Sequence, residues 1–91
     1  LALLGNRPNP FSLRTAICYD LPSSAEVNLR VFDVSGRLVR VLIDGVVQKA
    51  GRRYVLWDGR DQQGRPVGSG VYFYLFEAGN EDFRGKMILI R

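Results

Sequence analysis

The chain contains no histidine, and this absence removes several kinds of chemistry. Histidine is the side chain that most often acts as a general base near neutral pH, and without it no serine can be activated in a Ser-His-Asp triad. Because Cys18 is the only cysteine, the usual zinc and transition-metal ligand sets are also missing. We therefore expect no metal centre, no cofactor and no enzyme activity.

A single cysteine also cannot form a disulfide within the chain, and we expect Cys18 to be a surface or edge residue. No run approaches the ~18 apolar residues that a membrane helix needs, so we expect no membrane insertion. The chain does not begin with Met and shows no signal-peptide pattern. We expect a piece of a longer protein, with Arg91 as the natural C-terminus.

The chain has few lysines, and its net charge of +4 comes mostly from arginine. The arginines are spread along the chain and most alternate with apolar residues, which is typical of the solvated faces of strands. A nucleic-acid-binding protein would gather them on one face among aromatic side chains. We therefore expect no nucleic-acid partner.

What the sequence does contain is the pattern of an all-β protein. The 91 residues suffice for one domain, and their apolar fraction of 46% is that of a globular chain. Apolar residues alternate with polar ones in short runs, with turn residues every eight to twelve positions or so. This pattern predicts an antiparallel β-sandwich of about seven strands, of the immunoglobulin or fibronectin-III kind.

The first half of the chain predicts three strands. Residues 13–21 alternate cleanly, and residues 26–34 follow with an apolar side that switches near the end, indicating a twist or bulge. The third strand covers residues 37–43. The dipeptide Asp44-Gly45 then allows either a hairpin to a short strand or a crossing loop, and we favour the loop.

The second half is organised around residues 54–74. One strand ends at Trp57, a polar loop follows, and residues 65–67 are at most an edge strand because Pro66 cannot donate a ladder hydrogen bond. The next strand, residues 71–78, is apolar on both sides, which predicts that both of its faces are at least partly covered. A last strand covers residues 83–91.

Residues 1–12 are expected to form a lead-in segment or linker before a sandwich domain at residues 13–91. Pro8 and Pro10 favour extended or polyproline-like backbone and block ladder hydrogen bonds. We expect Phe11 to anchor this segment on the domain. A disordered tail with one stray aromatic residue is the alternative.

Asp58 and Asp61 are the candidates for chemistry in the polar loop. They could hold Ca²⁺, flank a glycosidic bond, or accept hydrogen bonds from loop amides. The loop lacks the dense acidic ligand pattern of a calcium loop, so we favour the amide-capping role for Asp58, which follows Trp57.

Five aromatic residues could likewise form a sugar-stacking platform or part of the core: Tyr54, Trp57, Tyr72, Tyr74 and Phe76. We favour the core, with Trp57 at its centre. The glycines of the same region do not predict a phosphate site, because no helix follows them.

Taken in order, several short pieces of the chain resemble the C-terminal sorting domain of the type IX secretion system and the related immunoglobulin-like domain of flagellar hook-capping proteins. The pieces are Asn9-Pro10-Phe11, residues 17–22, residues 31–37, Gly51, residues 57–61, Gly64, residues 69–74 and residues 86–91. The opening Asn9-Pro10-Phe11 and the ending at 86–91 favour the sorting domain.

The resemblance implies a non-catalytic module that targets an upstream exported protein through the outer membrane to the cell surface. Its implied partners are the outer-membrane secretion machinery with its sortase and a cargo domain in the same chain, which crosses the periplasm in transit. The implied sorting signal consists of Lys86, Met87, Ile88, Leu89, Ile90 and Arg91. The structural motif residues are Pro10, Phe11, Gly36, Arg37, Trp57, Asp58, Gly59, Gly70 and Tyr72.

Three other functions stay open at this point. The domain could be an immunoglobulin-like spacer or adhesion domain of an extracellular protein. It could be a carbohydrate-binding accessory domain that uses exposed Tyr or Trp side chains. It could also be a flagellar hook-capping domain.

Overall fold

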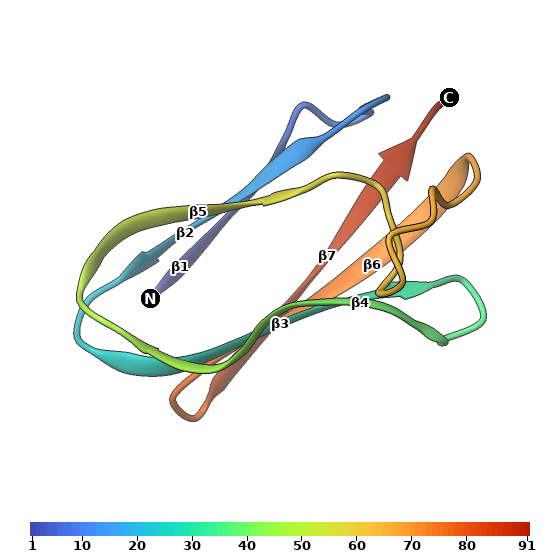
Figure 1. Cartoon of the computed structure of the whole chain (residues 1–91). Coiled ribbons are helices and arrows are strands. Elements are labelled where there is room, and N and C mark those ends of the chain that lie inside the picture. Colours follow the sequence, from blue (N-terminus) through green and yellow to red (C-terminus); the bar gives the residue numbers. More distant parts are fainter.

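Seven β-strands and no helix make up the computed structural model, which describes residues 1–91 (Figure 1). The strands are β1 (Ala2–Arg7), β2 (Thr15–Leu21), β3 (Ala25–Asp33), β4 (Leu38–Gln48), β5 (Gly51–Trp57), β6 (Gly70–Ala78) and β7 (Glu81–Leu89). They form one layer in the order β1-β2-β5 and a second in the order β4-β3-β6-β7, with antiparallel pairing throughout both layers. The predicted β-sandwich is confirmed. No helix suited to spanning a membrane is present.

Alternation along the strands decides which side chains form the core. In β2, every second residue from Thr15 to Leu21 is buried, and in β3 the buried residues are Val27, Leu29 and Val31. These inward faces were predicted from the sequence and are confirmed. Leu13, which the same alternation placed inward, is 75% exposed because β2 begins only two residues later.

Trp57 lies between the two layers, as predicted, and is fully buried. Its ring meets Phe11 edge-on at a centroid distance of 5.6 Å and Tyr72 of β6 at 5.3 Å. Edge-to-face contacts of this kind add to the stability that burial of the rings provides. The indole therefore joins the N-terminal segment, β5 and β6 in one aromatic cluster.

The N-terminal residues differ from the prediction of a lead-in segment. Residues 2–7 form strand β1, which pairs with β2 and is part of the sandwich. After β1 the chain bends at residues 8–10, where the bonds Arg7–Pro8 and Asn9–Pro10 are both cis. Phe11 is 3% exposed and anchors the segment as expected.

Strand β4 is longer than predicted, because the Asp44-Gly45 dipeptide is neither a hairpin nor a crossing loop. Gly45 has a φ of 64° and lies in a β-bulge, where the pairing register shifts between β3 and β4. Its N–H donates to the side-chain oxygen of Asn28 at 2.8 Å, which replaces the lost ladder acceptor. The strand continues to Gln48, and the chain crosses between the layers at residues 49–50 instead.

The edge strand considered at residues 65–67 is absent. Only one isolated bridge, Arg60 to Pro66, occurs in the loop between β5 and β6. The loop is instead closed on itself, because Asp61 N donates to Arg65 O at 2.9 Å and Gly64 N donates to Asp61 O at 3.0 Å. The count of seven strands is retained because β1 takes the place of this edge strand.

Strand β6 also differs from its prediction of two covered faces. Its inner face carries Tyr72, Tyr74 and Phe76, which are buried. No element of the chain packs over its outer face, where Phe73 is 40% exposed. The apolar side chains of this outer face therefore contact only their neighbours within the sheet.

We expect Gly85→Ala in β7 to destabilise the fold by ~1–3 kcal/mol, the usual cost of overpacking. Gly85 lies opposite Tyr74 of β6, and a Cβ atom at position 85 would overlap the Tyr74 ring. Urea denaturation measures the change in the free energy of unfolding. Gly68→Ala is the matched control, because a Cβ there meets nothing within 4 Å; equal losses in both variants would contradict the packing argument.

We expect the domain to lose stability at alkaline pH. Burial raises the pKa of Tyr19 and of Tyr74, and these effects exceed the opposing hydrogen bond from Tyr19 to Gln48. The folded state thus holds these protons at a pH where the unfolded chain releases them, so stability is complete below pH about 10 and falls as the pH rises further. Urea unfolding over this range measures the loss.

Tyr74→Phe tests the origin of the alkaline loss. The variant removes one buried ionisable hydroxyl, so its stability should fall less steeply above pH about 10 than that of the unaltered chain. An identical slope would show that Tyr74 does not contribute.

Candidate functional site at the C-terminal strand

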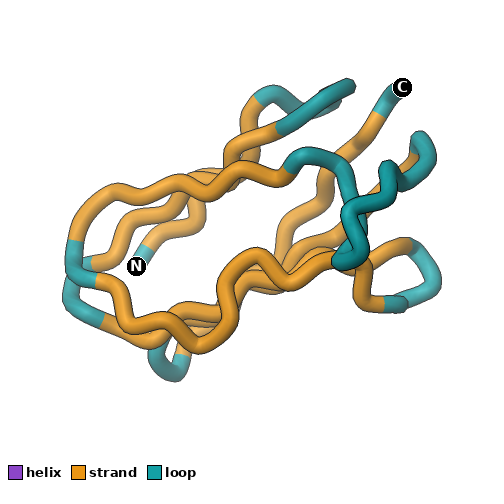
Figure 2. The backbone as a smooth tube through the Cα atoms, in the orientation of Figure 1, coloured by secondary structure: helices purple, strands orange, loops and turns teal.

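One end of the sandwich gathers most of the residues singled out in the sequence. The teal segments at that end in Figure 2 are residues 8–14, the turn between β3 and β4, and the loop between β5 and β6, and the C-terminus lies beside them. Their contacts are made mostly through backbone groups, and these contacts fix the position of the last residues of the chain.

The segment Asn9–Phe11 pairs with the outer edge of the C-terminal strand. The side chain of Asn9 donates to Lys86 O at 3.2 Å and accepts from Ile88 N at 3.0 Å. Phe11 N then donates to Ile88 O, and Ile90 N donates to Phe11 O, both at 2.9 Å. The amide of Asn9 thus acts like one more peptide group, and the edge from Lys86 to Ile90 is closed to further strand pairing.

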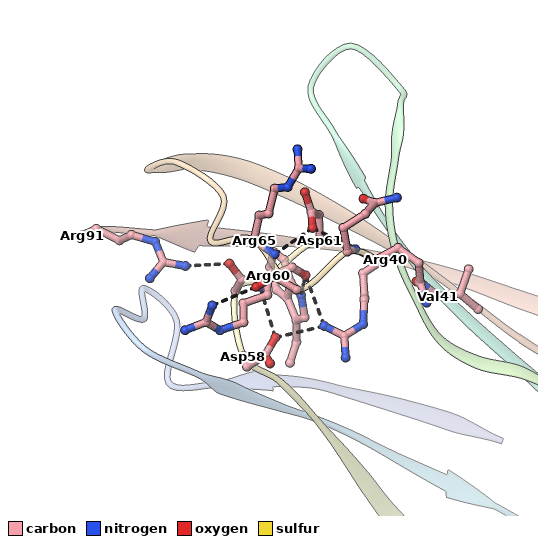
Figure 3. Close-up of polar contacts among 12 residues, drawn as sticks. Arg40, Val41, Asp58, Arg60, Asp61, Arg65 and Arg91 are labelled. Carbon is pink, nitrogen blue, oxygen red and sulfur yellow. Dashed lines mark hydrogen bonds and ion pairs between the residues drawn. The ribbon is translucent and has the colours of Figure 1, made fainter.

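Arg91 ties the end of the chain to the loop between β5 and β6 (Figure 3). Its guanidinium donates to Gly59 O at 2.6 Å and to Val67 O at 2.8 Å, while its backbone N donates to Ser69 Oγ at 2.8 Å. Gly59 has a φ of 69°, and a Cβ there would lie 2.5 Å from an Arg91 nitrogen. Glycine at this position therefore provides both the turn and the space for Arg91.

The loop that receives Arg91 is built by its two aspartates. Asp58 Oδ1 accepts from Arg60 N and from the guanidinium of Arg40 in β4, each at 3.1 Å (Figure 3). Asp61 Oδ1 accepts from the backbone N of Gln63 at 3.0 Å and of Arg65 at 2.9 Å. Both carboxylates therefore cap loop amides, and for Asp58 this role was predicted from the sequence. No three His, Cys, Asp or Glu side chains gather as they would to bind a metal ion.

The same loop covers the opposite edge of the large sheet. Gln62 donates its backbone N–H to Val39 O at 3.0 Å, and its side-chain oxygen accepts from Val41 N at 2.8 Å. Both edges of the β4-β3-β6-β7 sheet are thus blocked at this end of the molecule. Covering an edge in this way prevents pairing with other chains.

Gly36 and Arg37 belong to the tight turn between β3 and β4. Gly36 has a φ of 85°, and its N–H donates to Asp33 O at 3.0 Å. The carboxylate of Asp33 accepts from the Ser35 hydroxyl and from Arg37 N, and these hydrogen bonds hold the pKa of Asp33 below its usual range. Both residues therefore contribute to the tight turn.

Tyr72 and Gly70 lie at the start of β6, beside a cleft of about 610 Å³. The Tyr72 hydroxyl donates to Gly68 O at 2.7 Å, and burial, with a smaller contribution from Asp33, raises the pKa of Tyr72. The cleft lies between the β3–β4 turn and the polar loop. Its carboxylates, Asp33 and Asp61, are already engaged in turn hydrogen bonds.

The six residues of the implied sorting signal divide between the core and the surface. Met87 and Leu89 are buried, whereas Lys86 and Ile90 are exposed and Ile88 is half-buried. The buried side chains of Met87 and Leu89 stabilise the sandwich and are hidden from any partner of the folded domain. Only the residues of the outward face remain accessible.

The sugar-stacking alternative fails for most of its candidate residues. Trp57, Tyr72, Tyr74 and Phe76 are buried in the core, where no ligand reaches them. Of that set only Tyr54 is exposed, at 71%.

Sequence reasoning missed the part played by three polar side chains. The bridge made by Asn9, the tether made by Arg91 and the edge cover made by Gln62 all depend on contacts between distant segments. The Asn9-Pro10-Phe11 piece had been noted for its resemblance. Its pairing with residues 86–90 had no signal in the alternation pattern.

Comparison with known proteins shows what this arrangement is similar to. A family model described as the FlgD Ig-like domain matches residues 12–82. Among solved structures, PorZ, an essential bacterial surface component of the type-IX secretion system of Porphyromonas gingivalis, matches with a TM-score of 0.66 and 20% identity over 99% of this chain and 12% of its own. Dimeric latent PorU from Porphyromonas gingivalis matches with a TM-score of 0.72 and 22% identity over 97% of this chain and 9% of its own.

At these identities the two solved structures show that the fold is shared. The chain spans only a small part of the length of either protein. A search of curated proteins finds no match.

We expect Asn9→Ala to expose the edge of the C-terminal strand. The variant removes the acceptor of the Ile88 amide, and the loss of one such hydrogen bond costs roughly 0.5–1.5 kcal/mol. Hydrogen exchange at the Ile88 amide should therefore quicken by up to about tenfold. Asn80→Ala in the β6–β7 turn is the control, and unchanged exchange at Ile88 in Asn9→Ala would refute the bridging role.

Proposed function

We propose that this chain, which belongs to the family of FlgD Ig-like domains, is a non-catalytic sorting module of an exported protein. In this role it directs the protein across the outer membrane by the type IX route. The protein crosses the periplasm in transit and then reaches the cell surface or the medium. The partners are the outer-membrane secretion machinery with its sortase, and a cargo domain in the same chain.

The observation that carries this proposal is the pairing of the two ends of the chain. The family match covers residues 12–82, so Asn9–Phe11 and Lys86–Arg91 lie outside it. These are the two pieces whose resemblance favours a sorting domain over a hook-capping domain. In the structure they form one unit through four hydrogen bonds, which supports a common role for them.

The solved structures that share the fold add support. PorZ is described as part of the type-IX secretion system, and PorU comes from the same organism. Nearly the whole of this chain aligns with a part of each. A module of this fold thus occurs in a protein of the pathway that we propose.

The last six residues divide into buried and outward-facing side chains, and this division suggests how the secretion machinery would recognise the folded domain. Lys86, Ile88 and Ile90 point away from the core, while the backbone edge beside them is covered by Asn9–Phe11. Recognition of the folded domain would thus rely on these outward side chains. Strand addition to β7 at this position would require the segment to leave first.

The proposed role needs no catalysis, and the carboxylates considered for it are otherwise engaged. Asp58 accepts from Arg60 N and pairs with Arg40, and Asp61 organises the loop. These contacts explain both residues through the structure of the loop.

Export of a passenger tests the proposal. A signal peptide and a fluorescent protein are fused ahead of residues 1–91 and expressed in a bacterium with a type IX system. We expect the passenger at the cell surface or in the medium, and we expect deletion of residues 86–91 to leave it in the periplasm. Fractionation followed by immunoblotting measures both; a passenger that stays in the periplasm with the intact module would refute the role.

The deletion also removes the buried side chains of Met87 and Leu89, so it tests folding and recognition together. Ile90→Asp separates the two, because Ile90 is 57% exposed. If the secretion machinery recognises the outward face, the Ile90→Asp variant should fold normally but its passenger should stay in the periplasm. Tyr54→Ser, at an exposed site on the other layer, is the control and should leave export unchanged.

A spacer function is the second candidate, and the position of the termini favours it. The N-terminus and the C-terminus lie toward opposite ends of the sandwich, which is 37 Å long (Figure 1). Such a module would extend a chain of domains by about its own length. It would not export the fused passenger, so the same experiment distinguishes the two functions.

A further inference from the structure

The outer face of the four-stranded sheet carries a cluster of apolar side chains. In one row across the sheet, Leu38 of β4, Phe32 of β3 and Phe73 of β6 lie next to each other. Val71 and Leu75 flank Phe73 on the same side of β6. We call these five residues the outer apolar face.

This face is open and slightly hollowed. Leu38 is 49% exposed and Phe73 is 40% exposed. A hollow of about 310 Å³ lies over Phe32, Phe73 and Leu75, and Arg84 of β7 and Asp33 of β3 form part of its wall. The hollow is wide enough to accept side chains from a partner.

The sequence of β6 makes this exposure unusual. A strand with apolar residues on both sides is typical of a sheet that is covered on both faces. The chain covers only the inner face of β6. Contiguous apolar surface on a soluble domain commonly marks an interaction site.

The charges beside the hollow indicate the chemistry of the partner. Arg84 and Lys86 lie on the outer side of β7 next to Leu75 and Phe73, and neither takes part in an ion pair within the chain. The nearby Arg30 is paired with Glu77 at 3.0 Å, and the Asp33 carboxylate in the wall of the hollow is paired with Arg37 at 3.3 Å. Two cations beside an apolar hollow are complementary to apolar side chains flanked by carboxylates.

We propose that the outer apolar face binds a protein segment in which Leu or Phe side chains are flanked by Asp or Glu. The apolar side chains enter the hollow, and the carboxylates meet Arg84 and Lys86. Phe32 and Leu75 are half-buried in the sheet surface, which suits a segment that lies flat on it better than insertion into a lipid layer. This inference does not depend on the export role, since it concerns the isolated domain and a defined ligand.

Binding of short synthetic peptides to the ¹⁵N-labelled domain tests the proposal. The first peptide carries Leu and Phe flanked by Glu on both sides, the second carries Lys in place of Glu, and the third carries Ser in place of Leu and Phe. We expect only the first to bind in the micromolar range at low salt, at least about tenfold more tightly than either of the others. The amide shifts should centre on Phe32, Phe73 and Arg84.

Two pairs of variants assign the contacts. Phe73→Ser should weaken binding by about tenfold or more, and Tyr54→Ser on the other layer should not. Arg84→Glu should reverse the preference between the Glu and Lys peptides. Arg14→Glu makes the same change in net charge at an exposed position before β2 and should leave the preference as it was. Thermal unfolding confirms that each variant is folded.

Several results would overturn the proposal. The Glu peptide could fail to bind up to millimolar concentration, or the Lys peptide could bind as tightly as the Glu peptide. The amide shifts could also centre on residues outside the outer apolar face. Sedimentation that shows a dimer lost on Phe73→Ser would assign the face to a second copy of the chain. Binding to phosphatidylglycerol vesicles that is lost on Phe73→Ser would assign it to a membrane surface.

Discussion

The indole of Trp57 is the contact on which both layers of the sandwich depend. It is fully buried, and its N–H donates to Arg60 O at 3.0 Å, so its polar atom is satisfied inside the core. That acceptor is available because Asp58 turns the chain directly after the indole. The buried ring and the loop that follows it are therefore one structural unit, and the partners of the ring come from Phe11 and from Tyr72 in the facing sheet.

The aromatic cluster and the C-terminal strand are linked through the same residues. Phe11 packs its ring on Trp57 while its backbone pairs with Ile88 and Ile90. The carbonyl oxygen of Gly59, two residues after Trp57, accepts a hydrogen bond from the guanidinium of Arg91. The position of the last residues thus depends on the core directly, and a change that displaces the indole would also loosen the end of the chain. The candidate site is part of the fold and is not an appendage to it.

The sequence predicted those features that follow from local alternation and turn chemistry. The inward faces of β2 and β3 could be predicted because each is set by the polarity of neighbouring residues. The amide-capping role of Asp58 could be predicted because its partner, Arg60 N, lies only two residues away. Strand β1 was missed because its pattern is irregular and two prolines follow it. The continuation of β4 through Gly45 was missed because Asn28, seventeen positions away, supplies the missing acceptor. The bridge made by Asn9 depends on a contact between the two ends of the chain and leaves no trace in the local pattern.

The pairing of Asn9 with Ile88 spans 79 positions. A chain emerges from the ribosome N-terminal end first, so this segment is made well before its partner strand at the other end of the domain. Contacts of such long separation form slowly, because a large loop must close before they contribute any stability. The finished arrangement can therefore arise only after synthesis of the domain is complete. Until then the growing polypeptide lacks its closing strand, and the edge of β6 that pairs with β7 in the finished domain stays open.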